Sequence, residues 1–535
     1  MARSHAATAL LGSRASRPRD IFKVAVVMLC WTAAAVTIAF SPPVQLSIPS
    51  VPNSSPRAAL DVLRCSAAEE LGSFHTWLEE KGVSTSAVNG KRLPGFGLSL
   101  TVGETGIKKG DKLLVVPSSL HITPSATAAS PLGQAVSEVV APDDVASLLA
   151  LGLLQEVGKG AASSAAPYIE MLPGMDGMAG VPLLYGDEEL SKLLGGSHLV
   201  NMVQSERNQL IAQWQAIETT VMPKYDESLF PRDTFNVGGF LWAHAIVLTR
   251  ALPFGDELSL IPFLDLANHQ SGAPNTCSIG MVEKGKDGEG DDRVIPVADP
   301  LQLEGKEGAA VLTAGVDLET GAQVFIDYGE AGWRSSWEML YTYGFVPGEK
   351  SEEWLAAGGR PIFFDGISES DAMYQQKRAV LDALAGGEDE SFWAGMWVDL
   401  KADPSSCVAM APLLRLSKLS SDETSAELKP FAERLASWQA EPMETWTRLQ
   451  SPLDERTEKL VAEQVIAQCE EALTQLPPVE TLIKTSEPAA EGAEPDDGRA
   501  RMAARVLLGE RNALEACINV WKREAAAVAA KAEAN

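Results

Sequence analysis

The spacing of apolar residues changes along the chain and divides it into segments with different secondary structure. Residues 61–81 predict a helix, because their large apolar side chains recur close to multiples of a helical turn. These residues are Leu63, Leu71, Phe74 and Leu78. Short apolar runs separated by glycine follow, and Lys112–Pro117 predicts a strand after the turn signal at residues 108–111. The folded part of the chain therefore begins with a helix and continues into β-rich sequence.

Helical spacing returns between residues 143 and 250. Asp143-Asp144 suits a helix cap, because an apolar stretch with helical periodicity starts directly after it at Val145. Further helices are predicted over residues 187–222 and 233–250. This part of the chain therefore reads as a helical region placed between stretches of β-like sequence.

Short strands are predicted again from about residue 258 to 346, and helical sequence runs from about residue 370 to the end. The polar stretch Glu283–Asp292 interrupts the strands and predicts a solvated loop. The acidic stretch Ser486–Asp497, which contains proline, predicts a disordered break. The last helix has one apolar face, formed by Leu507, Leu514, Ile518 and Trp521.

This succession predicts an α+β fold. A β-rich domain covers residues 65–347 and contains a helical insertion at about residues 140–250, and an all-α C-terminal domain covers residues 370–525. A chain of 535 residues, 45 % of them hydrophobic, is long enough for two or three domains.

Residues 1–60 have the composition of a targeting presequence. The apolar run 24–40 follows Lys23 and four arginines, and it is about as long as the core of a signal peptide. A segment rich in serine and proline, without an acidic residue, then extends to Asp61. The Ala39–Pro42 junction resembles the bipartite presequences that direct proteins into the complex plastids of algae with secondary endosymbionts. A membrane anchor or a secretion signal formed by residues 24–40 is the competing interpretation.

The net charge of −28 limits the classes of partner. Residues 1–60 contain six basic residues and one acidic residue, so the rest of the chain carries a net charge of −33. Such an acidic surface repels a phosphate backbone, which argues against a nucleic-acid partner. A solvated acidic surface is favoured over a surface that attracts basic substrate segments.

The six cysteines are widely spaced, with no CxxC pair and no histidine at ligand spacing. This pattern argues against a zinc site and against a disulfide framework, so we expect no metal and ordinary thiols. We also expect no stable membrane association once the presequence is removed. Because the sequence suggests no coiled coil and no symmetric patch, a monomer is expected.

Three segments carry residues suited to chemistry. In the first, an apolar run from residue 259 ends in a turn that presents Asp265, Asn268 and His269. In the second, apolar residues alternate on a strand that delivers Tyr328 at its end, and Tyr343 follows it. Taken singly, such histidines and tyrosines are more often structural residues that have found their hydrogen bonds.

The third segment is the glycine-bearing turn Pro94-Gly95-Phe96-Gly97-Leu98. Glycine occurs in turns for backbone reasons alone, so this turn carries no functional signal by itself. The order and spacing of the three segments together are far more specific than any one of them.

Together the three segments resemble the SET domain, and within it the class typified by the Rubisco large-subunit lysine methyltransferase. Pro94–Leu98 resembles the N-terminal SET motif, Asp265–His269 the family's D-L-x-N-H element, and Ile326–Gly329 its catalytic tyrosine motif. Further resemblances cover about residues 65–525. They are Thr249-Arg250 in place of a Ser-Arg pair, Pro167–Pro173 in the helical insertion, and Leu508–Leu514 in the last helix.

The resemblance implies a cofactor site for S-adenosyl-L-methionine, the methyl donor. It assigns cofactor binding to Pro94, Gly95, Phe96, Asn268 and His269. It also implies that the segment bearing the catalytic tyrosine passes beside the Asn-His strand, in a knot-like arrangement that is rare among folds.

The resemblance assigns catalysis to Tyr328 and substrate contacts to Arg250, Asp265 and Tyr343. Methyl transfer requires a neutral amine, alignment with the methyl carbon and a water-poor channel, and Tyr328 would orient the amine. An Arg250–Asp265 pair with a purely structural role is the alternative for those two residues. A member of the family has a second arginine four residues after the Ser-Arg pair, whereas this chain has Phe254 there, so its substrate pocket departs from that member's.

The predicted activity is methylation of a lysine in a plastid protein, such as the Rubisco large subunit or fructose-bisphosphate aldolase. Two alternatives remain from the sequence. One is a protein-histidine methyltransferase of the same fold, and the other is a SET-fold binding protein without catalysis. Retention of Asn268, His269 and Tyr328 together counts against the second alternative.

Overall fold

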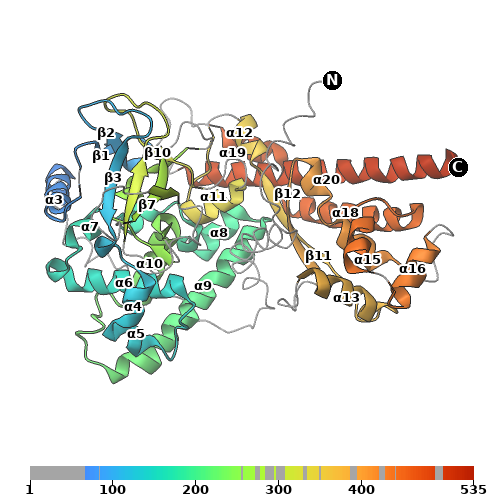
Figure 1. Cartoon of the computed structure of the whole chain (residues 1–535), viewed down its shortest axis with the longest axis horizontal. Helices are drawn as coiled ribbons and strands as arrows, with labels where there is room; N and C mark the ends of the chain where they lie inside the picture. Colours follow the sequence, from blue (N-terminus) through green and yellow to red (C-terminus); the bar gives the residue numbers. More distant parts are fainter. Residues whose placement is uncertain are drawn as a thin grey trace.

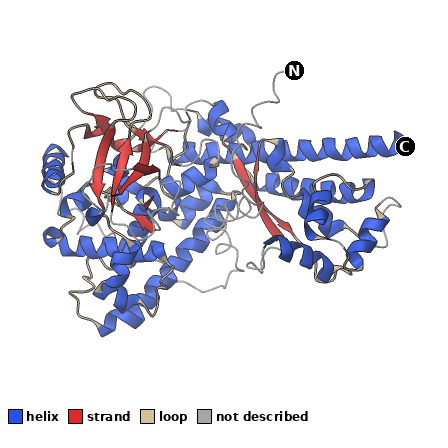
Figure 2. Cartoon of the chain, in the orientation of Figure 1, coloured by secondary structure: helices blue, strands red, loops and turns tan. Residues whose placement is uncertain are grey.

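The computed structural model shows a mixed α/β part joined to a predominantly helical part (Figures 1 and 2). In Figure 1 the strands of the first part stand at the left, and the long C-terminal helix extends to the right beyond the rest of the chain. The structure describes residues 67–83, 85–254, 257–270, 277–283, 294–296, 308–328, 334–348, 351–385, 395–420, 428–439, 441–487 and 498–534. The predicted presequence, residues 1–60, lies outside the described residues.

The first described element is the predicted N-terminal helix, α3 (Ala67–Glu80). Phe74 and Leu78 are buried at 1 % and 0 % exposure, as their helical spacing predicts. The preceding residues 61–66, also part of the predicted helix, lie outside the described residues. After α3 the chain enters an antiparallel pair of strands, β1 (Val88–Leu93) and β2 (Gly97–Val102).

A four-stranded sheet forms the centre of the β-rich part. Its order is β3-β9-β7-β8, with antiparallel pairing between neighbours. The predicted strand at residues 112–117 is β3, and most of the predicted solvated loop, residues 284–292, lies outside the described residues. The strands are β3 (Lys112–Pro117), β7 (Ser278–Glu283), β8 (Val294–Pro296) and β9 (Gly308–Thr313).

Two shorter strand pairs complete this part. One is the antiparallel pair β4 (Leu252–Phe254) and β5 (Glu257–Ser259). The other is the parallel pair β6 (Asn268–His269) and β10 (Phe325–Ile326), which brings together segments far apart in the sequence. Parallel neighbours need a crossover connection, and here the crossover contains strands of the central sheet.

The predicted helical insertion packs below the strands in Figure 1. Of the predicted cap Asp143-Asp144, Asp144 caps α6, since its side chain accepts a hydrogen bond from the Ser147 amide. The helix predicted over residues 187–222 is broken at Gly195 and Gly196, after which the Ser197 hydroxyl accepts a hydrogen bond from the Leu199 amide and starts a new helix. The helices are α4 (Pro124–Ala129), α5 (Pro131–Val136), α6 (Val145–Lys159), α7 (Ala166–Met171), α8 (Asp187–Leu194), α9 (His198–Ala216) and α10 (Val237–Arg250).

Among the described residues, one stretch is helical, long and apolar enough to cross a membrane by length and composition, namely Val145–Ala162. It includes α6, whose residues from Ser147 to Leu154 are all buried in the core of the first part. Buried core helices meet the same criteria, so this stretch is weak evidence for a membrane span.

The second part follows α11 (Ser336–Tyr343) and α12 (Ser351–Ala356). The all-α prediction needs one correction, because residues 395–401 form a strand, β12, that pairs antiparallel with β11 (Gly359–Asp365). The physical reason is a period of two, since buried Val398 and Leu400 alternate with more exposed neighbours. The remaining elements are helices. They are α13 (Tyr374–Ala385), α14 (Pro404–Cys407), α15 (Ala411–Lys418), α16 (Lys429–Ala436), α17 (Pro442–Leu449), α18 (Glu455–Gln475), α19 (Val479–Ser486) and α20 (Arg499–Ala534).

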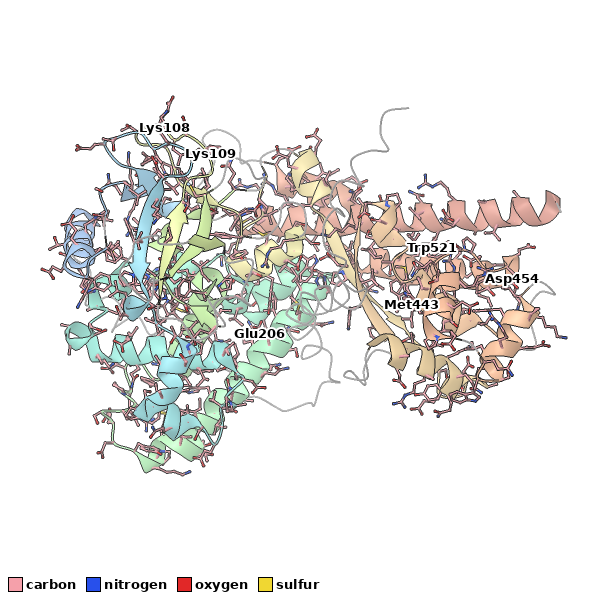
Figure 3. All side chains as sticks on the ribbon, viewed as in Figure 1. Lys108, Lys109, Glu206, Met443, Asp454 and Trp521 are labelled. Carbon is pink, nitrogen blue, oxygen red and sulfur yellow. The ribbon has the colours of Figure 1, made fainter. Side chains whose placement is uncertain are left out.

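The apolar face predicted for the last helix is buried. Leu507, Leu514, Ile518 and Trp521 of α20 all lie in one core with residues of α18. The Trp521 indole Nε1 donates a hydrogen bond to the Cys407 carbonyl at 2.7 Å, which ties α20 to α14 (Figure 3). The predicted disordered break begins where α19 ends, and its residues 488–497 lie outside the described residues.

The same core crosses the boundary between the two parts. Side chains of α8, α9 and α11 lie in it together with those of β11, β12, α18 and α20. The buried Glu510 carboxylate of α20 accepts hydrogen bonds from Arg360 of β11 and from Ser197 at the start of α9. The helical part is therefore joined to the insertion by a shared core and by a buried ion pair.

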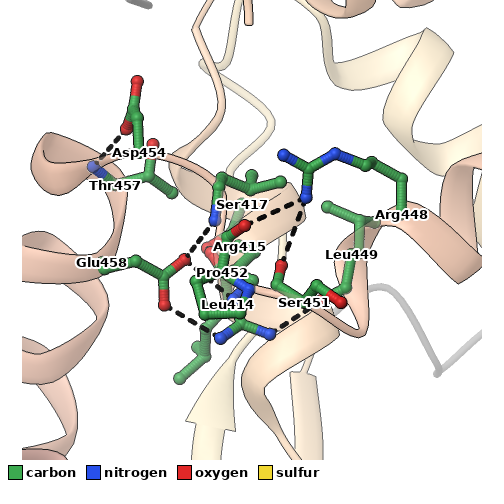
Figure 4. Close-up of polar contacts among 11 residues, drawn as sticks. Leu414, Arg415, Ser417, Arg448, Leu449, Ser451, Pro452, Asp454, Thr457 and Glu458 are labelled. Carbon is green, nitrogen blue, oxygen red and sulfur yellow. Dashed lines mark hydrogen bonds and ion pairs between the residues drawn. The ribbon is translucent and has the colours of Figure 1, made fainter. Parts of the chain in front are cut away.

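A second buried ion pair lies inside the helical part (Figure 4). Arg415 of α15 donates to both carboxylate oxygens of Glu458 on α18, at 2.8 and 2.9 Å, and to the Leu449 carbonyl at 2.9 Å. The Glu458 carboxylate also accepts from the Leu453 amide at 2.9 Å. A buried pair in which both partners are this well hydrogen-bonded links α15, α17 and α18.

Candidate active site

The three segments singled out in the sequence meet at one place. Phe325 pairs with Asn268 and Ile326 with His269, so the strand that leads to Tyr328 runs parallel to the Asn-His strand. The Phe96 ring lies edge-on to the Phe325 ring, with 6.0 Å between centroids. The turn after β1 therefore lies over β10, next to β6.

The turn at Pro94–Phe96 exposes its main chain. Gly95 and Gly97 have φ angles of 78° and 67°, a region that favours glycine. No atom of the described residues, apart from its own chain neighbours, lies within 4 Å of the position where a Gly95 Cβ would stand. Phe96 is half exposed, at 50 %. The main chain at this turn can therefore be approached closely by a ligand.

The side chain of Asn268 is fixed by a neighbour that the sequence analysis did not single out. Its Nδ2 donates a hydrogen bond to the Ser99 hydroxyl at 2.7 Å. Ser99 is fully buried on β2, directly after the glycine turn. This contact joins the turn segment to the Asn-His segment and sets the orientation of the amide, whose oxygen remains an acceptor.

His269 holds the segment that carries the tyrosine. Its ring Nδ1 accepts a hydrogen bond from the Tyr328 amide at 3.1 Å. Burial lowers the pKa of His269, against the opposing effect of the nearby Asp327 carboxylate. The ring is therefore neutral at pH 7, which leaves Nδ1 free of a proton and able to accept this bond.

Tyr328 lies at the centre of the site. Its hydroxyl donates a hydrogen bond to the Ala267 carbonyl at 3.0 Å, and its ring stacks at a tilt on Tyr343 with 4.5 Å between centroids. Burial raises the pKa of the Tyr328 hydroxyl well above its usual range. The hydroxyl therefore stays protonated at neutral pH and serves as a hydrogen-bonding group rather than as a base.

Asp265 and Arg250 are also brought to this place. The Asp265 carboxylate is buried, and its Oδ2 receives the Tyr168 hydroxyl at 2.9 Å and Arg250 Nη1 at 3.4 Å. Arg250 Nη1 also donates to the Asp265 carbonyl at 3.3 Å. Burial raises the pKa of Asp265, and Arg250 and Tyr168 act in the opposite direction.

The backbone before Asp265 is strained. Phe263 has a φ angle of 71°, which is rare for a residue with a large side chain. Its fully buried ring packs edge-on against Phe74 and His75 of α3, at 5.7 and 5.2 Å between centroids. Packing therefore holds the strained turn that directs Asp265 and the Asn-His strand into the site.

Tyr343 is the last residue of α11, and Gly344 ends that helix in the left-handed conformation with a φ angle of 76°. The Arg334 guanidinium lies 5.7 Å from the centre of the Tyr343 ring. Phe254, which stands where the resemblance places a second arginine, is buried and packs against the His121 ring at 4.8 Å between centroids. An apolar contact thus takes the place of a second cation.

Two residues of this site received no role from the sequence, Ser99 and Tyr168. Tyr168 lies within the insertion segment Pro167–Pro173, which resembles the family, but it is 97 residues from Asp265. No spacing rule connects residues so far apart. Ser99 could have been suspected, because it follows the glycine turn on a strand whose neighbours are apolar.

Comparison with known proteins supports the motif-based resemblance. The family model described as Rubisco LSMT substrate-binding matches residues 368–514. A curated relative from Nicotiana tabacum, a chloroplastic ribulose-1,5 bisphosphate carboxylase/oxygenase large subunit N-methyltransferase, is 26 % identical over 455 residues. The alignment covers 84 % of this chain and 81 % of the relative. The protein of the same description from Pisum sativum is 24 % identical, with coverages of 84 % and 82 %.

Solved structures give the same result at the level of the fold. A structure of the SET domain of LSMT bound to lysine and AdoHcy matches with a TM-score of 0.68 and 22 % identity, covering 86 % of this chain and 92 % of that one. A structure of Rubisco LSMT bound to AdoMet matches with a TM-score of 0.66 and 21 % identity, covering 86 % and 93 %. The predicted α+β class, with a SET fold and a helical C-terminal region, is confirmed.

Proposed function

We propose that this chain, which has the SET fold and carries a substrate-binding domain of the Rubisco large-subunit methyltransferase type, is an S-adenosylmethionine-dependent protein-lysine N-methyltransferase. One observation carries the proposal. The Gly95 turn, the Asn268-His269 strand and Tyr328 come from three distant parts of the chain, and they are joined by strand pairing and by the hydrogen bonds of Asn268 with Ser99 and of the Tyr328 amide with His269. The curated relatives, which this chain matches over most of its length, are large-subunit N-methyltransferases.

The residues present fit S-adenosylmethionine. The open main chain at Gly95 allows a close approach, and the Asn268 amide, turned by Ser99, offers its oxygen as an acceptor. The main chain of Pro94–Phe96 together with Asn268 and His269 would hold the molecule. When bound, it supplies a methyl group attached to a positively charged sulfonium.

The residues around Tyr328 prepare the acceptor amine. The Tyr328 hydroxyl donates a hydrogen bond to the Ala267 carbonyl, so its lone pairs face away from that bond and can accept a hydrogen bond from an N–H of the amine. An amine held in this way has a defined lone-pair direction, which is what an in-line transfer requires. Because burial raises its pKa, Tyr328 orients the amine and does not remove its proton.

The substrate-contacting group is made of Asp265, Arg250 and Tyr343. Tyr343 extends the aromatic wall of Tyr328, and its own pKa is raised by burial, so it too remains neutral. Aromatic rings around an amine exclude water and stabilise a cationic product. Asp265, paired with Arg250, is the acidic member of this group.

The protein substrate is the Rubisco large subunit in a plastid. The chloroplastic relatives support both the substrate and the compartment. The resemblance of Ala39–Pro42 to bipartite presequences refines the compartment to the complex plastid of an alga. Fructose-bisphosphate aldolase is the second candidate substrate to test. The chain acts as a monomer.

The test is a methylation assay with labelled S-adenosylmethionine and either purified Rubisco or a stromal extract. We expect label on one protein band, retained S-adenosylmethionine binding but loss of label in Tyr328→Phe, and weakened S-adenosylmethionine binding in Asn268→Ala. Mass spectrometry of the labelled band identifies the modified side chain. Label on histidine would replace lysine with histidine as the acceptor, and failure of the chain to bind S-adenosylmethionine in calorimetry would refute the proposal.

A further inference from the structure

We infer that Tyr168 is a positioning residue of the substrate site. It holds Oδ2 of the Asp265 carboxylate so that Oδ1 accepts a hydrogen bond from the ammonium group of the incoming lysine. The inference rests on the proposed function, because it assumes that a lysine side chain enters beside Tyr328.

The two oxygens of the Asp265 carboxylate have different surroundings. Oδ2 receives hydrogen bonds from Tyr168 and Arg250, whereas Oδ1 is buried and has no hydrogen-bond partner among the described residues. The Asp265 side chain has no exposed surface, so bulk water does not serve Oδ1. A buried carboxylate oxygen without a donor is costly, and such exceptions call for an explanation.

A ligand that supplies an N–H donor would satisfy the unpartnered Oδ1 of Asp265. Asp265 lies two residues before Ala267, whose carbonyl receives the Tyr328 hydroxyl, and the charges of Asp265 and Arg250 both act on that hydroxyl. The Asp265 carboxylate is therefore near the Tyr328 hydroxyl, beside which the amine must lie for methyl transfer. An ammonium group suits it, because a charge-assisted hydrogen bond in a buried site is stronger than a neutral one.

Tyr168 is suited to hold the carboxylate. It lies on α7 of the insertion, it is buried at 1 % exposure, and its hydroxyl bond to Oδ2 at 2.9 Å is shorter than the 3.4 Å contact from Arg250. The shorter of the two bonds to Oδ2 therefore comes from a buried ring, which fixes the orientation of the carboxylate more firmly than the longer Arg250 contact does. Loss of the hydroxyl would leave it to rotate toward Arg250, which would remove Oδ1 from the amine.

The charge of Asp265 also depends on Tyr168. The titratable groups that face the carboxylate are Tyr168 from α7, Arg250 from α10 and Tyr328 after β10. Burial raises the pKa of Asp265, and the Tyr168 hydroxyl and Arg250 lower it. Removal of the hydroxyl therefore raises the pKa of Asp265, so protonation on acidification occurs at a higher pH.

The test compares Tyr168→Phe with Tyr185→Phe in the full chain. Tyr185 is a matched control, since it is also a buried tyrosine of the insertion whose hydroxyl donates one hydrogen bond, to the Gly180 carbonyl at 3.0 Å. The probes are L-lysine and L-norleucine, which has the same carbon chain without the side-chain amine, in calorimetry with S-adenosylhomocysteine present. Binding is measured across a pH range that includes the acid side of neutrality.

We expect the unmodified chain to bind L-lysine and not L-norleucine. Tyr168→Phe should weaken L-lysine binding about tenfold or more, while Tyr185→Phe keeps it, and both should bind S-adenosylhomocysteine normally. The loss of lysine affinity on acidification should move to higher pH in Tyr168→Phe only. Asp265→Asn, which keeps the shape but not the charge, should abolish lysine binding and keep S-adenosylhomocysteine binding.

Two results would overturn the inference, and they are distinguishable. If Tyr168→Phe binds L-lysine with unchanged affinity and unchanged pH dependence, Tyr168 has no positioning role and the proposed function stands. If the unmodified chain binds S-adenosylhomocysteine but not L-lysine, the lysine acceptor of the proposed function fails together with the inference.

Discussion

At the scale of single residues, the buried histidines make folding sensitive to acid. Burial lowers the pKa of His121 and His244 to about 4 each, from an ordinary value near 6.5. As the pH falls from about 6.5 to about 4, the unfolded chain takes up protons that the folded chain does not. The stability that these histidines contribute is fully present above about pH 6.5 and is lost across that window.

His244 allows this effect to be measured. It lies on α10, with its Nε2 3.4 Å from the Ser147 hydroxyl and its ring against Phe240. We expect the denaturant midpoint of unfolding to be constant between pH 7 and 8 and to fall between about pH 6.5 and 4, less steeply in His244→Leu. Equal slopes for the two proteins in that window would contradict the low pKa of His244.

The sequence predicted the residues of the site better than their contacts. Asn268, His269 and Tyr328 could be recognised because residue type, order and spacing together resemble a family motif, and their roles in binding and catalysis stay predictions. The Arg250–Asp265 contact was foreseen as an alternative, but Tyr168 on the same carboxylate was not. Contacts between residues about a hundred positions apart depend on how the insertion packs, and local spacing does not encode that.

At the scale of elements, Gly344 fixes where α11 ends and thus where Tyr343 lies. Gly344 has a φ angle of 76°, and an added Cβ would come within 2.9 Å of the Gly180 main chain. Gly82 has a similar φ angle of 80° but open space around it, so it is a matched control. We expect Gly82→Ala to cost about 1–2 kcal/mol of unfolding free energy, and Gly344→Ala to cost more.

The additional effect of Gly344→Ala should also reach activity. The backbone must move to relieve the contact with Gly180, and Tyr343 is the preceding residue, stacked on Tyr328. Methyl transfer should therefore fall in Gly344→Ala and be retained in Gly82→Ala, as measured by initial rates at a temperature where both are folded. Equal losses of stability and full activity in both variants would show that the contact is easily relieved.

The ion pair between Arg415 and Glu458 links three helices of the C-terminal part (Figure 4). Arg415→Met should destabilise the protein by about 3–5 kcal/mol, because it leaves the Glu458 carboxylate buried without its cation. The double variant Arg415→Met/Glu458→Leu should recover much of that loss, since no unpaired charge remains. Chemical denaturation measures both, and a double variant as unstable as the single one would assign the effect to packing instead.

Strands were harder to predict than helices in the C-terminal part. Seven residues, 395–401, carry the period of two that marks β12, but they stand between long stretches of helical spacing. Their partner β11 is hydrogen-bonded along its length from Gly359 to Asp365, and α20 packs on both strands. A short strand of this kind is fixed by its partner and by the helix behind it, and neither is visible in its own sequence.

At the scale of the whole molecule, the domain bounds predicted from the sequence stay a prediction, and the junction between the parts was not foreseen. The insertion helices α8 and α9 share a core with α20, which lies about 300 residues later in the chain. An amphipathic pattern shows that a helix has an apolar face, but it does not show which surface covers that face. The junction could therefore be recognised only from the folded chain.

Glu510 is the charged centre of this junction. Burial alone would raise its pKa, but Arg360, His198 and Ser197 together hold the pKa of Glu510 below its usual value. The carboxylate is therefore ionised at neutral pH and tied to β11 and to the start of α9 at once. It couples the part that contains Tyr328 to the part that matches the substrate-binding family model.

Glu510→Gln should show whether this coupling serves the protein substrate. Removing the charge leaves Arg360 buried without its partner, so we expect a loss of about 3–5 kcal/mol of unfolding free energy and a tendency of the two parts to melt separately in calorimetry. Glu444→Gln is the control, because its pair with Arg434 is exposed and should contribute less than about 1 kcal/mol.

The same variant tests substrate binding at temperatures below the first unfolding transition. There, KM for a protein substrate should rise in Glu510→Gln while the affinity for free L-lysine is kept, because the candidate active site lies in the other part. If both affinities fall together, the junction supports the active site itself, and if neither changes, the junction contributes to stability alone.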